Sequence, residues 1–95
     1  MLQNPLAQVL GIVPPRPKFE LFQSVRSHYV YEDISQLDDI GIIIGYFYSP
    51  GLNAYGYEAG WLYVVCWHSM PSSPHLHLPY IEESHQDELR PLDLT

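Results

Sequence analysis

Two strongly apolar segments separated by a turn constrain the fold of this chain more than any other feature. Residues 41–48 (GIIIGYFY) and residues 60–67 (GWLYVVCW) are rich in β-branched and aromatic side chains, which favour strands. Between them lie Pro50, Gly51 and Asn53, which are typical turn residues. The sequence therefore predicts one antiparallel hairpin with an enlarged loop.

Neither face of this hairpin is polar, although a sheet with one solvent-exposed face normally alternates apolar and polar residues. Because side chains alternate along a strand, one face is expected to carry Trp61, Tyr63, Trp67, Tyr46 and Tyr48. Smaller aliphatic groups suit a narrow interior better than two tryptophans, so the expected core is Ile43, Phe47, Leu62, Val64, Val25 and Leu89. The aromatic face must then be covered by the N-terminal arm, the proline-rich loop, a second copy or a partner. We expect its five aromatic residues to bind another polypeptide.

The rest of the chain predicts two regions, an N-terminal arm with a connector at 1–18 and one domain at 19–95. Pro14-Pro15-Arg16-Pro17 imposes extended backbone on the connector, and a PxxP-type ligand motif is the alternative interpretation. The expected order of the domain is a first strand at 19–30, an acidic loop at 32–39, the hairpin, a loop at 68–79, a short strand at 80–81, and a one-turn helix with a closing strand at 87–94. This layout predicts an all-β fold, a small SH3-like barrel of about five short antiparallel strands.

The order of glycines and apolar residues also resembles a known family. The relevant residues are Phe19 and Val25, Asp39-x-Gly41-x-Ile43-x-Gly45, Gly60-Trp61-x-Tyr63-x-Val65, and Glu88-Leu89. Over residues 19–94 the chain resembles the small SH3-like barrels of cyanobacterial and plastid proteins, such as the variable chain of ferredoxin–thioredoxin reductase and ferredoxin-side subunits of photosystem I and the photosynthetic NDH complex. The resemblance implies a non-catalytic accessory subunit. Ferredoxin is acidic and needs a basic docking surface, so we do not expect it as the partner of this acidic chain.

The charge balance excludes several classes of partner. The chain has 11 acidic and 4 basic residues, a formal net charge of −7, whereas nucleic-acid binders present basic patches. Nucleic acid and anionic membranes are therefore not expected partners. No apolar run approaches the roughly 20 residues of a membrane span, no signal-type start is visible, and Cys66 is the single cysteine. Together these features predict a cytoplasmic protein.

Four side chains near the second hairpin strand offer possible chemistry, namely Cys66, His68, His75 and His77. His75-x-His77 on a strand would present both rings to one face, where a third ligand would complete a zinc site. Their spacing matches no common zinc motif, and Cys66 lies in an apolar strand without the neighbouring charge that a reactive thiol needs. We therefore predict no metal, no cofactor and no catalytic residues.

Two pairs of acidic residues, Asp38-Asp39 and Glu82-Glu83, are expected in solvated loops, because neither lies in a glycine-centred calcium loop. With no catalytic set, the expected function is a non-enzymatic protein-binding or accessory subunit of a larger complex, docking through the aromatic face. The alternative is a small metal- or cysteine-dependent enzyme that uses Cys66 and the three histidines.

Overall fold

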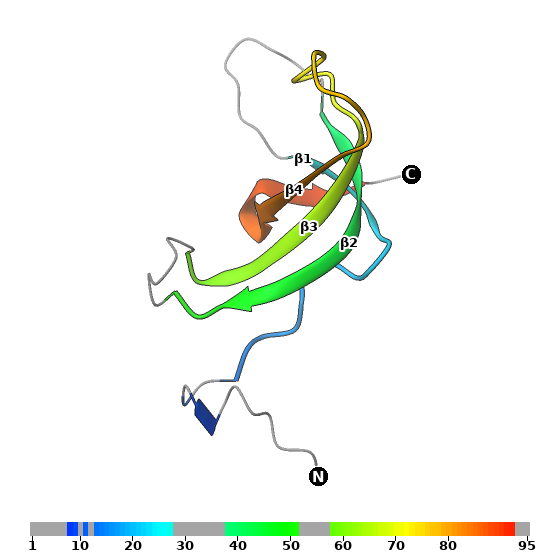
Figure 1. Cartoon of the computed structure of the whole chain (residues 1–95). Helices are drawn as coiled ribbons and strands as arrows, with labels where there is room; N and C mark the ends of the chain where they lie inside the picture. The colour runs from blue at the N-terminus through cyan, green and yellow to red at the C-terminus, as the bar shows by residue number, and fades with distance from the viewer. Residues whose placement is uncertain (1–7, 10, 12, 28–37, 52–57, 93–95) are drawn as a thin grey trace.

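The described part of the chain forms one antiparallel sheet (Figure 1). The computed structural model describes residues 8–9, 11, 13–27, 38–51 and 58–92. Within these ranges the elements are β1 (Ser24–Ser27), β2 (Ile40–Ser49), β3 (Gly60–Ser69), β4 (Tyr80–His85), the 3-10 helix η1 (Gln86–Glu88) and β5 (Leu89–Pro91). The five strands lie in the order β4-β3-β2-β1-β5. The all-β prediction is confirmed, and no helix in the described ranges has the length and apolar character needed to cross a membrane.

The predicted hairpin is confirmed as β2 paired with β3, and it contains two bulges. Pairing runs from Ile43 opposite Val65 directly to Gly45 opposite Val64, so Ile44 is an extra residue on β2. Nearer the other end, Ile40 pairs with Ser69 and Gly41 with Trp67. His68 is therefore the extra residue on β3. Bulges bend strands and increase their twist, and Figure 1 shows the long hairpin strongly curved.

The core lies on the aromatic face of β3, which is the reverse of the sequence prediction. Tyr63 and Trp67 have exposed fractions of 0% and 1%, so their predicted place on an accessible surface is wrong. They pack with the other members of one buried cluster, Phe19, Val25, Ile43, Val65, Met70 and Leu89. The larger rings bury more apolar area than the aliphatic side chains would, and this favours their burial.

A glycine opposite Trp67 makes room for the large ring in the core. Gly41 pairs with Trp67 across the hairpin, and a Cβ atom at Gly41 would lie 2.8 Å from Trp67 Cε3 and 2.6 Å from Val65 Cγ1. The polar atoms of the buried aromatics also find partners. Trp67 Nε1–H donates to Glu82 Oε1 at 3.1 Å. Burial of a tryptophan is favourable when space and an acceptor are both present.

The aliphatic part of the core prediction is only partly correct. Val25, Ile43 and Leu89 are buried as expected, and Leu62 is also buried, on the opposite face from Tyr63 and outside the main cluster. Phe47 is 36% exposed and Val64 is half-buried, so both predictions are wrong. The Ile44 bulge explains the error on β2, because it places Ile43 on the same face as Tyr46 instead of the opposite one.

The segment before β1 is a turn instead of the predicted strand. Gln23 N–H donates to the Glu20 carbonyl at 3.2 Å, and Phe22 has a left-handed φ of 67°. Strand pairing begins only at Ser24. Phe19, just ahead of this turn, is 1% exposed, so the N-terminal segment is anchored in the core before the sheet begins.

Candidate functional site

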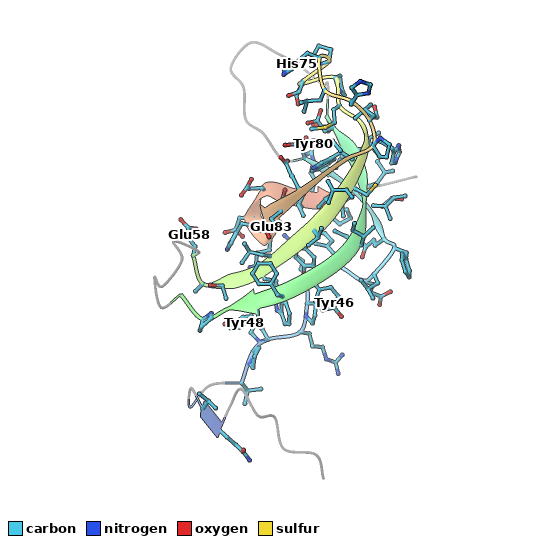
Figure 2. The ribbon with its side chains drawn as sticks, viewed as in Figure 1. Tyr46, Tyr48, Glu58, His75, Tyr80 and Glu83 are labelled. Atoms are coloured by element: carbon cyan, nitrogen blue, oxygen red, sulfur yellow. The ribbon has the colours of Figure 1, made fainter. Side chains whose placement is uncertain are left out.

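Three partly exposed aromatic side chains form a contiguous cluster at the end of the hairpin where β2 ends and β3 begins. Tyr46 and Tyr48 on β2 and Trp61 on β3 define this aromatic cluster. The Trp61 ring lies edge-on to both tyrosines, with centroid distances of 5.4 Å to Tyr46 and 5.2 Å to Tyr48. Tyr46 is 40% exposed and the other two are half-buried. Figure 2 shows both tyrosines on the side from which the N-terminal segment approaches the sheet.

Strand pairing and η1 position the cluster. Tyr48 pairs with Trp61 and Tyr46 with Tyr63, so the four rings share one face. The backbone N–H of Trp61 donates to Gln86 Oε1 at 2.9 Å, which ties β3 to η1. Gly60 has a φ of 129°, and a Cβ atom there would lie 2.9 Å from the His85 ring. The start of β3 therefore lies closely against the junction of β4 and η1.

The proline-rich connector crosses this cluster. Trp61 Nε1–H donates to the carbonyl oxygen of Pro15 at 2.9 Å. Further along the connector, the backbone N–H groups of Lys18 and Phe19 both donate to the Tyr63 hydroxyl, at 2.6 and 3.1 Å. The Phe19 ring then lies 5.1 Å from the Tyr63 ring in an edge-on contact. Aromatic side chains therefore hold the connector by its backbone.

Comparison with known protein families, curated proteins and solved structures found no match.

The four residues considered for metal or thiol chemistry do not form a site. Cys66 is half-buried in β3, and His68, His75 and His77 are exposed. His75 and His77 lie in the loop between β3 and β4 (Figure 2), not on a strand as their spacing would require. Among the described residues, no group of three or more His, Cys, Asp or Glu side chains is arranged to hold a metal ion.

The paired acidic residues are less solvated than the sequence suggested. Asp39 is 1% exposed. Its carboxylate accepts hydrogen bonds from both the backbone N–H and the hydroxyl of Ser72, and its own N–H donates to Ser27 Oγ at 3.0 Å. Asp39 thus joins the start of β2 to the β3–β4 loop. The predicted solvated position of Asp39 is wrong, because the backbone N–H and the hydroxyl of Ser72 satisfy the buried carboxylate.

Asp38 has a different structural role, between two arginines. Arg26 and Arg90 stand opposite each other on β1 and β5. Arg90 Nη2 lies 2.7 Å and Arg26 Nη1 3.5 Å from Asp38 Oδ2. The shared carboxylate offsets the repulsion of two like charges on paired strands. These contacts account for two of the four basic residues of the chain.

Glu82 carries a carboxyl group whose pKa is raised in the folded chain. Burial against the sheet raises the pKa of Glu82, the hydrogen bond from the Trp67 indole lowers it, and the carboxylates of Glu88 and Asp39 raise it, with an upward net shift. The carboxyl faces the core tryptophan on the same face of the sheet. Its position indicates a structural role in seating that ring.

The connection between Pro15 and Trp61 is the site feature that sequence patterns could not reveal. The two residues are 46 positions apart. The sequence offered a weaker signal, an extended proline-rich stretch in a chain with an uncovered aromatic face. That signal suggested coverage by the N-terminal arm in general but not which ring or which carbonyl is used.

Proposed function

We propose that this chain is a non-catalytic protein-binding domain, an accessory subunit of a larger assembly, and that it contacts another polypeptide through the aromatic cluster. The observation that carries the proposal is the hydrogen bond from the Trp61 indole to the Pro15 carbonyl. A partly exposed tryptophan between two tyrosines already recognises the backbone of an extended segment here. Tyrosine and tryptophan are also the residues most enriched at interface hot spots.

The finer features of the proposal have separate support. We propose an SH3-like barrel, supported by the sheet order β4-β3-β2-β1-β5 and by η1 between the last two strands. The single half-buried cysteine suits a reducing compartment, which supports a cytoplasmic location.

The contact surface is smaller than the sequence suggested, because it retains Tyr46, Tyr48 and Trp61 but not the buried Tyr63 and Trp67.

Site-specific photo-crosslinking tests this function. A photoreactive phenylalanine analogue replaces Tyr46 in the full-length protein, in the cell from which the sequence comes. The matched control carries the same analogue at Phe47, which is 36% exposed but lies on the opposite face of the same strand. We expect a discrete crosslinked protein from position 46, absent at position 47 and lost when Trp61→Ala is added. Equal crosslinking from both positions, or none from position 46, would contradict the proposal.

A further inference from the structure

The connector that crosses the aromatic cluster has the composition of a ligand segment. Residues 14–18 read Pro-Pro-Arg-Pro-Lys. Three of the five residues have no backbone N–H, so the segment mainly accepts hydrogen bonds. Steric restriction of the residues before each proline favours a polyproline-type extended conformation, and residues 13–17 adopt neither helix nor strand. The segment is therefore extended before it makes any contact.

The aromatic cluster supplies a hydrogen-bond donor to such an acceptor-rich segment. Trp61 Nε1–H is aimed at a proline carbonyl, at 2.9 Å. The other tryptophan, Trp67, is buried and donates to Glu82, so its indole is not available at this surface. Extended proline-rich peptides bind to aromatic-lined grooves in this manner, and their prior rigidity reduces the entropy lost on binding.

Charge complementarity also matches the segment to its surroundings. The chain carries a formal charge of −7, and two of its four basic residues, Arg16 and Lys18, lie in this one segment. Both are exposed. Glu58, two residues before β3, adds an exposed acidic group near this end of the hairpin. An occupant with basic residues among its prolines is therefore favoured by the field of the domain.

Among the described residues of the connector, the firmest anchor lies at its C-terminal end. Phe19 is buried in the core and its N–H is bonded to Tyr63. In the other direction, Pro15 and Arg16 are exposed and Val13 is 74% exposed. The Trp61–Pro15 hydrogen bond is itself solvent-exposed. Residues 14–17 can therefore leave the cluster without removing Phe19 from the core.

From these observations we infer that the aromatic cluster binds extended proline-rich segments containing basic residues, and that the chain's own segment 14–18 occupies the site as an intramolecular competitor. The inference depends on the proposed protein-binding function and specifies its partner class and its regulation. A segment tethered through Phe19 is present at an effective concentration on the order of millimolar. An external segment must displace it. The apparent dissociation constant of that external segment is its intrinsic value divided by the fraction of molecules in which the site is open.

Peptide titration of full-length variants tests this inference. The probe is a capped synthetic peptide with the sequence of residues 13–18, and the control peptide has alanine in place of each proline. The open variant, Pro14→Gly with Pro15→Gly and Pro17→Gly, keeps Phe19 and the whole sheet. We expect the proline peptide to bind this variant about tenfold or more tightly than it binds the unmodified protein, because the competitor is weakened. The alanine peptide should not bind either protein.

The indole N–H resonances supply a second readout in the same samples. The chain has two tryptophans, and each gives one indole signal by NMR. The Trp61 signal should shift in the open variant and return toward its original position when peptide is added, while the Trp67 signal, bonded to Glu82, should stay constant as an internal control. Adding Trp61→Phe should remove peptide binding with the fold intact by circular dichroism.

Specific outcomes would overturn the inference. It fails if the folded open variant does not bind the proline peptide, or binds the alanine peptide equally well. Concentration-dependent dimerisation of the open variant without peptide binding would assign the cluster to a second copy and also overturn it. The crosslink from position 46 is scored independently, so a partner without proline-rich segments would refute this inference while leaving the protein-binding function supported.

Discussion

Replacing Tyr63 with phenylalanine should destabilise the domain although it removes only one oxygen. The Tyr63 hydroxyl accepts the backbone N–H groups of Lys18 and Phe19. The Phe19 bond is buried, so its donor would lose its partner without access to water, whereas the Lys18 donor is only partly buried and can be rehydrated. Leaving a buried donor unsatisfied costs about 1–3 kcal/mol, and we expect a decrease of about 2 kcal/mol in the free energy of unfolding.

The measurement is urea denaturation followed by tryptophan fluorescence, repeated by thermal unfolding. A decrease of that size lowers Tm by roughly 10 °C in a domain of this length. The matched control is Tyr46→Phe, in which the hydroxyl belongs to a side chain that is 40% exposed and water can replace any bond it makes. If both variants lose less than about 0.5 kcal/mol, the hydroxyl does not hold the connector to the core and the reasoning is refuted.

Three further predictions concern the packing and electrostatics of the sheet. Gly41→Ala should lower the free energy of unfolding by about 1–3 kcal/mol, because its Cβ would lie 2.6 Å from a methyl of Val65. Gly45→Ala should be close to neutral, because the nearest contact of its Cβ would be 3.7 Å away. Denaturation midpoints distinguish the two variants. Val65→Ala should lower the free energy of unfolding by about 2 kcal/mol and Val64→Ala by clearly less, and equal losses would contradict the observed core face. Because the pKa of Glu82 is raised in the folded state, its contribution to stability is fully present below the unfolded pKa and is lost as pH rises through the folded pKa. Glu82→Gln should therefore flatten the pH dependence of Tm across that window, and an unchanged pH profile would contradict the assignment.

The order of elements was largely predictable because each strong segment carried its own local signal. The β-branched and aromatic runs at 41–48 and 60–67 predicted β2 and β3 within one or two residues, and the prolines around them predicted the loops. The short strand at 80–81 was underestimated, since β4 continues to His85 through the polar residues Glu82 to Ser84. Those residues pair with the apolar β3, and tertiary pairing outweighed their weak intrinsic preference for strands.

The core face was not predictable, because both faces of the hairpin are apolar and the choice depends on tertiary detail. Gly41 provides room for Trp67, and Glu82 provides an acceptor for its indole. Both become neighbours of the ring only through strand pairing. The bulge at Ile44 also shifts the alternation of side chains along β2, and periodicity alone cannot locate a bulge. For the same reason, only three of the five aromatic residues predicted at the contact surface are accessible there.

The two bulges of the hairpin have a consequence for how this strand pair can change in length. One extra residue lies on β2 at Ile44 and one on β3 at His68, so both strands still contain ten residues. Deleting Ile44 alone would leave Ile43, Gly45 and Tyr46 facing the same ways, because the residue stands outside the regular alternation. Deleting a residue farther along β2 would instead turn over the residues between the deletion and the bulge. Single-residue gaps in descendants or ancestors of this sequence should therefore concentrate at these two positions, and elsewhere in the hairpin they should be eliminated by selection.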